Sequence, residues 1–303
     1  LSGFFQNNLT LYFSLFSLGI FYGFFSLSRH SFMTQIVPSE YRGKAFSRFG
    51  GINRIGWFFG PVVGGFTAGS LGVDIPFYFI SIVSIITAVI ILFSKEPDYE
   101  SIENPANIKS RTFKETILEN KKSFTVGGSG HFIMQFLRQC RHVLIPIWAF
   151  SIGLGVEELG LIQSISAAID MTLFYPVGLI MDKYGRKWTS VPSIILLSSG
   201  FIFLTYANSF TGLMFVGLIL GFANGLGSGA MLTLGSDLSP KNQPGSFLGI
   251  WRLFGWSGNS AGGPISGAIA QTVGNTASAL SVSMIGGIGI IIFSFFLPET
   301  LKE

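Results

Sequence analysis

Several polar side chains share one face of a predicted helix in an otherwise apolar part of the chain. His131, Gln135, Arg138 and His142 follow one another at intervals of four, three and four residues, which is the spacing of a single helix face. Arg141 lies three residues beyond Arg138, on nearly the same face. Because a polar stripe on a membrane helix must face protein or water, we expect this one to line a central cavity. Its guanidinium groups would favour anionic solutes there.

The next predicted helix, residues 158–181, carries a carboxylate about halfway along its length. This residue, Asp170, precedes Asp182 by twelve positions, or roughly 18 Å along a helix axis. Ionisable groups inside a bilayer cost several kcal/mol and are functional candidates for that reason. We expect a salt bridge from Asp170 to Arg138 or Arg141. Either this pair holds two helices in register, or Asp170 is a protonation site or substrate contact whose charge state responds to the nearby Arg.

A few other polar groups lie in predicted helices. Arg29, His30 and Arg54, the last beside Asn53, are expected at shallower depth. They could extend toward lipid headgroups, or they could line the cavity with the other arginines and make its interior basic. Asn224 lies in a glycine-rich helix, where it could contact a substrate or serve helix packing.

The composition places these residues in a membrane. The 303 residues are 49% hydrophobic, 15% aromatic and 11% charged, whereas soluble domains carry about 25% charged residues. The mean hydropathy is +0.56. Long segments contain no Asp, Glu, Lys or Arg, namely residues 1–28, 55–73, 75–94, 189–236 and 253–298. A cytosolic enzyme, a nucleic-acid-binding protein and a disulfide scaffold are therefore excluded, the last because Cys140 is the single cysteine.

Apolar stretches divided by Gly, Pro, Asn and charged clusters predict an all-α membrane protein with nine helices after a stub at residues 1–8. The expected ranges are 10–36, 46–71, 75–94, 123–152, 158–181, 189–207, 211–236, 246–271 and 276–297. The runs are continuously apolar, without the alternation of a membrane β-barrel. We expect a first part over residues 1–94, a linker over 95–122, and a complete six-helix half over 123–303.

Charges in the loops predict the orientation. Basic residues gather near residues 40–48, in the 95–122 linker and at 182–187, while the intervening loops have no Lys or Arg. Basic loops stay in the cytoplasm, so we expect the linker and the C-terminus there. The linker carries six basic and six acidic residues, which is typical of a solvated connection, with a short surface helix near residues 111–121.

The chain repeats itself at an offset of about 202 residues. Pro38 and Pro240 are 202 positions apart, and Pro61 and Pro264, each preceded by Gly, are 203 apart. Parallel repeats of this kind are one architecture of membrane transporters, with the solute site between the two halves. Because the first half shows three helices and a stub, we expect the chain to lack most of three preceding helices.

One loop combines turn-forming and charged residues at fixed spacing. The pattern G-x-x-x-D-[RK]-x-G-[RK]-[RK] is met by Gly178, Asp182, Lys183, Gly185, Arg186 and Lys187. Gly178 would let a neighbouring helix approach closely, and Gly185 would permit a left-handed turn. Asp182 could accept hydrogen bonds from the N-terminal amides of a helix or pair with an Arg. This segment resembles motif A of the major facilitator superfamily. The resemblance implies that it acts as a latch that closes the cytoplasmic side of the transporter.

A second motif lies in the predicted helix 46–71. It resembles the family's motif C, which is associated with proton-coupled antiporters, and consists of Gly56, Gly60, Pro61, Gly64 and Gly65. Small residues four apart form a smooth groove for helix contact, and the proline kinks the helix. The alternative to a role in antiport is ordinary helix packing. It is supported by the later half, which has a related Gly-Gly-Pro-x-x-Gly over residues 262–267, so that part of the pattern is common to both halves. The closing Leu-Pro-Glu-Thr at 297–300 also resembles the end of the last helix in this family. Many members carry an arginine in their fourth helix, in motif B, but the corresponding position here falls at about Leu15.

The resemblance covers nearly the whole chain and implies a major facilitator-type bundle with two pseudo-symmetric halves. It implies a secondary active transporter that works by alternating access, with proton-coupled efflux of small drugs or metabolites favoured. The alternative is an importer or exchanger of organic anions such as carboxylates or phosphate esters. We expect a small-molecule substrate, protons and the lipid bilayer as partners, a monomer in a bacterial inner membrane, and neither enzyme activity, a cofactor nor a bound metal.

Overall fold

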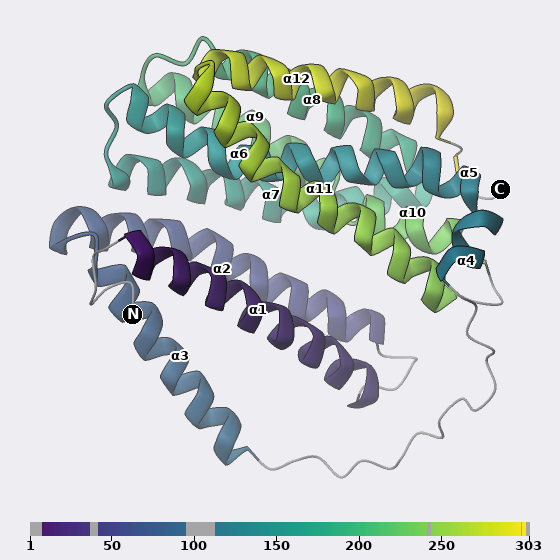
Figure 1. Cartoon of the computed structure of the whole chain (residues 1–303), viewed down its shortest axis with the longest axis horizontal. Coiled ribbons are helices and arrows are strands. Elements are labelled where there is room, and N and C mark those ends of the chain that lie inside the picture. The colour runs from purple at the N-terminus through teal and green to yellow at the C-terminus, as the bar shows by residue number, and fades with distance from the viewer. Residues whose placement is uncertain (1–7, 37–41, 95–112, 241–243, 298, 301–303) are drawn as a thin grey trace. The chain divides into compact units, whose positions relative to one another are not determined.

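The computed structural model describes residues 8–36, 42–94, 113–240, 244–297 and 299–300, and within these ranges every regular element is a helix (Figure 1). The all-α fold class predicted from the sequence is confirmed. The helices belong to two compact units, one within Leu1–Asn107 and the other within Ile108–Glu303.

The first unit contains three helices, α1 (Asn8–Ile36), α2 (Arg42–Leu71) and α3 (Ile75–Phe93). Helices α2 and α3 contact each other across the turn that joins them. Pro76 lies at the start of α3, where a missing backbone N–H costs no helical hydrogen bond. No residue of α3 is buried, although the helix consists almost entirely of apolar side chains. Such a surface is suited to hydrocarbon rather than water.

The second unit holds the remaining helices. They are α4 (Phe113–Glu119), α5 (Lys121–Ser123), η1 (Phe124–Gly128), α6 (Ser129–Ser151), α7 (Val156–Tyr184), α8 (Lys187–Leu204), α9 (Phe210–Leu226), α10 (Ala230–Leu238), α11 (Pro244–Thr272), α12 (Asn275–Ile291) and η2 (Ile292–Phe296). The elements η1 and η2 are short π-helical turns, which are wider than α-helical turns. η1 leads directly into α6, and η2 follows directly after α12. Helix α4 confirms the short helix expected near the end of the linker.

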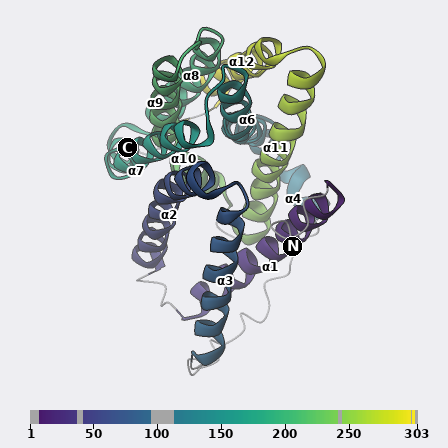
Figure 2. The same cartoon turned by 90° about the vertical axis from the view of Figure 1, so that its left-hand side faces the viewer.

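The long helices of the second unit pack side by side. Helix α6 packs against α11 and α12, α7 against α9, and α8 against α9 and α12 (Figure 2). Their shared core contains the fully buried side chains of Leu137, Leu220 and Phe293 and the almost fully buried ring of Trp251. These contacts fix how α6, α7 and α9 face one another, and these three helices carry the polar residues singled out above.

Five helical segments among the described residues are long and apolar enough to cross a membrane. They are Ile75–Phe93, Val156–Tyr184, Lys187–Leu204, Phe210–Leu238 and Asn275–Phe296. All nine ranges expected from the sequence contain helix. One expectation is wrong in detail, because the helix predicted over 211–236 is interrupted at residues 227–229. Gly229 adopts a φ of +78° there, in the left-handed region that glycine enters without strain.

Candidate functional site

The polar stripe on α6 does not face a single environment. Gln135, Arg138 and His142 are half-buried, as is Arg141, whereas His131 is 5% exposed. The Nδ1 atom of His131 lies 3.1 Å from the main-chain oxygen of Trp251 on α11, and the two rings stack with centroids 5.1 Å apart. The expectation that the whole stripe lines a cavity is therefore wrong for His131, which α11 covers.

A glycine on α11 explains why His131 fits inside the bundle. A Cβ atom at Gly255 would lie 2.5 Å from the imidazole ring, so only a residue without a side chain leaves room. Further along α11, a Cβ at Gly262 would lie 2.7 Å from the main-chain oxygen of Phe136 on α6. Helix α11 thus approaches α6 through small residues, as predicted for the Gly-Gly-Pro pattern of the later half.

The two arginines of the stripe reach across to the backbone of α9. Arg138 donates from Nη1 to Oε1 of Gln135 at 3.3 Å and from Nη2 to the main-chain oxygen of Asn224 at 3.4 Å. Arg141 donates from Nη1 to the main-chain oxygen of Leu220 at 3.2 Å. The structure therefore brings Asn224 to this site through its carbonyl group. Both guanidinium groups are fixed at mid-helix by the same neighbouring element.

Asp170 lies at the middle of α7, close to the same stretch of α9. A Cβ atom at Gly225 would lie 3.2 Å from the Cα atom of Asp170. Asp170 and the guanidinium group of Arg141 both lie beside α9, the first at Gly225 and the second at Leu220. Carboxylate and guanidinium groups of this kind, partly withdrawn from solvent, interact strongly. The salt bridge itself stays a prediction, with Arg141 as the favoured partner.

The close approach of α9 and α7 comes from three glycines that the sequence analysis did not single out. Gly217, Gly221 and Gly225 lie four residues apart on α9. A Cβ atom at each would collide with α7, at Ile162, at the main-chain oxygen of Ser166 and at Leu173, respectively. We call these three glycines the α9 seam. Spacing by four is the available signal in the sequence, and it brings Asp170 and the α9 backbone together.

The interruption after α9 leaves main-chain oxygens that side chains satisfy. The last four carbonyls of a helix lack intrahelical partners. Ser193 on α8 donates to the oxygen of Ala223 at 2.6 Å, and Arg138 donates to that of Asn224. A Cβ atom at Gly227 would lie 2.6 Å from Nη2 of Arg138. The broken helix, two arginines and one carboxylate form a polar cluster that could bind a polar solute or hold a proton.

A second cluster joins the connection between α7 and α8 to the end of the chain. Gly185 turns that connection with a φ of +103°. The carboxylate of Glu299 accepts hydrogen bonds from the backbone N–H groups of Arg186 at 2.9 Å and Lys187 at 3.0 Å. These are the first amides of α8, where a negative charge also stabilises the helix dipole. The predicted left-handed turn is confirmed, and it brings the two backbone amides to Glu299.

The side chains of the same loop extend this cluster to α10. The Nε atom of Arg186 lies 2.8 Å from Oδ2 of Asp237, at the end of α10. Thr300 donates from its hydroxyl to the same carboxylate at 2.7 Å. Lys187 donates from Nζ to the main-chain oxygen of Ser294 at 3.2 Å. The cluster of Arg186, Lys187, Asp237, Glu299 and Thr300, here called the loop cluster, thus ties together α8, α10 and the segment after η2.

Gly178 and Asp182 of the motif A segment lie outside the loop cluster. Within the second unit, no described atom lies within 4 Å of a Cβ position at Gly178, and the close helix contact expected there stays a prediction. Asp182 is exposed at the end of α7. The N-terminal amides of α8 donate to Glu299, and the role expected for Asp182 stays a prediction. Lys183 is also exposed, with Nζ 5.1 Å from the centroid of the adjacent Tyr184 ring.

The motif C residues lie in α2, where Pro61 is internal to the helix. Among the described residues, no atom lies within 4 Å of a Cβ position at Gly56, Gly60 or Gly64. Gly65 is buried. The predicted helix contact at this motif and its link to antiport both stay predictions. Arg54 is half-buried in the same helix, while the side chains of Arg29 and His30 lie outside the described residues.

Within the described ranges, no group of three or more His, Cys, Asp or Glu side chains is arranged to hold a metal ion.

Comparisons with known proteins identify the architecture. The family described as the Major Facilitator Superfamily matches residues 1–137 and 127–303. An MFS-type transporter of Methanocaldococcus jannaschii is 22% identical over 291 residues, covering 93% of this chain and 73% of that protein. The multi-drug resistance efflux pump PmrA of Streptococcus pneumoniae serotype 4 is 27% identical over 185 residues, covering 59% of this chain and 44% of the pump.

The fold is also similar to a solved structure, that of a D-xylose-proton symporter. The TM-score is 0.62 at 18% identity, with 88% of this chain and 66% of the symporter covered. At this identity the likeness shows the fold. Together with the apolar helices long enough to cross a bilayer, these matches identify an integral, multi-pass membrane protein. The chain belongs to the Major Facilitator Superfamily of membrane transporters.

Proposed function

We propose that this protein moves a small solute across the membrane by alternating access, and that proton-driven efflux is its activity. The observation that carries the proposal is the polar cluster at the middle of α6 and α7, where Arg138 and Arg141 donate to the α9 backbone and Asp170 packs against Gly225 of the same helix. A carboxylate at this depth can gain and lose a proton as the surrounding charges move. The similarity to a multi-drug resistance efflux pump supports export as the direction.

The loop cluster supports the alternating part of the mechanism. Arg186 with Asp237, and Glu299 with the first amides of α8, join helix ends that would have to separate if that end of the half opened. Charge-assisted bonds at an exposed position are individually modest, so they can break and re-form during a transport cycle. We propose that this cluster is the latch expected from motif A, with Glu299 as the acceptor for the first amides of α8.

A second function is favoured by the arginines themselves. Arg138 and Arg141 place two guanidinium groups near one carboxylate, which leaves the cluster with an excess of positive charge. Such a site suits a carboxylate or phosphate ester bound by paired hydrogen bonds. The alternative is therefore import or exchange of an organic anion, with the arginines contacting the substrate.

The two functions predict that different solutes trigger proton flux across the membrane. The complete gene product would be purified into liposomes that contain a pH-sensitive dye, and a proton gradient would be imposed. Proton flux triggered by lipophilic cations supports efflux coupled to protons. Flux or exchange with small organic anions alone supports the second function. Empty liposomes and liposomes with the Arg141→Gln variant separate leakage from transport, and flux equal to that of empty liposomes with every solute contradicts both functions.

A further inference from the structure

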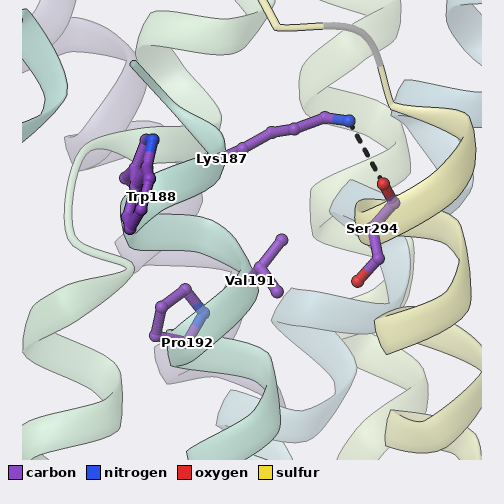
Figure 3. A pocket seen from close by; sticks show the side chains of 5 residues that line it. All are labelled: Lys187, Trp188, Val191, Pro192 and Ser294. Carbon is purple, nitrogen blue, oxygen red and sulfur yellow. Dashed lines mark hydrogen bonds between the residues drawn. The ribbon is translucent and has the colours of Figure 1, made fainter. Parts of the chain in front are cut away.

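A pocket opens on the second unit between the beginning of α8 and η2, away from the polar cluster of α6, α7 and α9. It is lined by Lys187, Trp188, Val191, Pro192 and Ser294 (Figure 3). The Lys187 side chain extends across its upper part toward Ser294, while Val191 and Pro192 form an apolar wall beneath (Figure 3). The pocket therefore combines one positive charge with a mainly hydrocarbon lining.

The geometry points to a binding site for an anionic phospholipid, with the phosphate at Lys187 and an acyl chain along Val191 and Pro192. The ammonium group of Lys187 has three donor hydrogens, and the main-chain oxygen of Ser294 accepts one of them at 3.2 Å. That bond holds the side chain over the pocket and leaves two donors for phosphate oxygens. The carboxylate of Glu299 accepts from the backbone N–H of Lys187 at 3.0 Å.

The position of the pocket along the helix fits the boundary between headgroups and hydrocarbon. Lys187 is the first residue of the span Lys187–Leu204, so it lies where that span begins. The adjacent Trp188 is 67% exposed and forms a ring pair with Tyr184, with centroids 6.3 Å apart. Exposed Trp and Tyr side chains gather at this level of a bilayer, because one edge of the ring is polar and the rest apolar.

Below the pocket, exposed apolar side chains continue along both helices. Ile195 on α8 is 43% exposed, and Ile291 on α12 is 52% exposed. Phe295 in η2 is 80% exposed. A lipid tail bound at Val191 and Pro192 would therefore continue along hydrocarbon without meeting a charged group among these residues. A free phosphate ion would leave the apolar lining unused, whereas a phospholipid would contact both the ammonium group and the apolar lining.

The test uses Trp188 as a reporter within the site. The complete gene product is reconstituted in phosphatidylcholine vesicles that contain about one fifth phosphatidylglycerol, with bromine on the acyl chains of one lipid or the other. The quenching at Trp188 is the difference between the parent protein and its Trp188→Phe variant. We expect phosphatidylglycerol to be enriched about fivefold at Trp188, as one lysine near an anionic lipid is worth about 1 kcal/mol.

Variants separate a specific site from a generally basic surface. Lys187→Gln should reduce the enrichment to that of the bulk mixture, and Lys187→Arg should retain it. Lys183→Gln is the matched control, because Lys183 is exposed at the end of α7, on the other side of the Gly185 loop, and does not line the pocket. Quenching in the bulk proportion, about four times stronger by brominated phosphatidylcholine than by brominated phosphatidylglycerol, would overturn the proposal whether or not the Lys187 variants fold. Equal losses in Lys187→Gln and Lys183→Gln would overturn it as well.

Discussion

At the scale of single residues, Asp170 carries the proposed coupling to protons. Replacing it with Asn keeps the size of the side chain and removes its charge and its ability to titrate. Loss of a charge interaction worth about 1.4 kcal/mol changes an equilibrium by about tenfold. We expect the Asp170→Asn variant to lose about tenfold or more of its proton-driven transport, while exchange of substrate without a gradient continues. Both activities are measured in liposomes.

The conservative variant Asp170→Glu provides the control, because it keeps a titratable group on α7. It should retain part of the proton-driven transport. Full proton-driven transport in Asp170→Asn would contradict the coupling role and leave the predicted ion pair with Arg141 as a purely structural hypothesis.

Glu299 permits a second prediction at this scale. Its carboxylate accepts from the backbone N–H groups of Arg186 and Lys187, so Glu299→Gln should weaken these two bonds. At an exposed position we expect a cost of about 1 kcal/mol, which corresponds to about fivefold faster hydrogen exchange at the two amides. Exchange resolved by peptide mass spectrometry across the start of α8 measures this change.

Glu158→Gln is the matched control for the Glu299 variant. Glu158 also caps a helix, accepting from the N–H of Gly155 at 2.8 Å, but this bond lies within the first turn of α7. Its loss should leave exchange at Arg186 and Lys187 unchanged. Unchanged exchange at these amides in Glu299→Gln would mean that Glu299 does not hold the loop cluster together in solution.

At the scale of helices, the α9 seam sets the distance between α9 and α7. In a Gly221→Ala variant the added Cβ atom would meet the main-chain oxygen of Ser166, which cannot move away as a flexible side chain could. We expect the variant to lower the free energy of unfolding by about 1–3 kcal/mol, although Ala favours helix more than Gly does. Thermal unfolding of the purified protein in detergent measures the effect.

A helical glycine in open space separates packing from helix propensity. A Cβ atom at Gly287 in α12 would have no described atom within 4 Å. Gly287→Ala should therefore be neutral or stabilising by up to about 1 kcal/mol. Equal unfolding temperatures for the two variants would show that α9 and α7 are not tightly packed at Gly221.

The positions of helices could be predicted from the sequence better than their contacts. Runs of apolar residues report burial in a bilayer, so all nine expected ranges contain helix. Hydropathy does not report a local turn, and the break at Gly229 was therefore missed. Helical spacing placed His131 on the face of Arg138 but could not show that Trp251 on a distant helix covers it. The face of a helix is a local property, whereas its neighbours depend on the whole bundle.

The same limit explains the outcome at the loop cluster. The left-handed turn at Gly185 is a local requirement, and it was predicted correctly. The sequence indicated that Asp182 could accept from the amides at some helix N-terminus, but it did not indicate that the acceptor for the α8 amides is Glu299, more than a hundred positions later in the chain. When the carboxylate that caps a helix comes from a distant part of the chain, the residues around the helix end show no spacing pattern that would predict it. The closing Leu-Pro-Glu-Thr segment was the available signal.

At the scale of the whole second unit, the two clusters are joined by shared helices. Helix α7 carries Asp170 at its middle and ends at the loop of Gly185, roughly 21 Å further along its axis. Helices α9 and α10 connect the carbonyls held by Arg138 to Asp237 in the loop cluster. A change of charge at Asp170 could therefore be transmitted to the loop cluster by movement of α7 against α9, with the break at Gly229 as the pivot.

The orientation of the chain provides the final prediction. Basic residues at 182–187 indicate that this loop faces the cytoplasm, and the loop at Asn208 should then lie on the opposite side. Single cysteines introduced as Lys183→Cys or Asn208→Cys would both be exposed to a reagent that cannot cross membranes. The native Cys140 is fully buried and should give little background. In intact cells we expect labelling at position 208, and at position 183 only after the membrane is opened. Labelling of position 183 in intact cells would reverse the orientation, and with it the side on which the loop cluster closes the transporter.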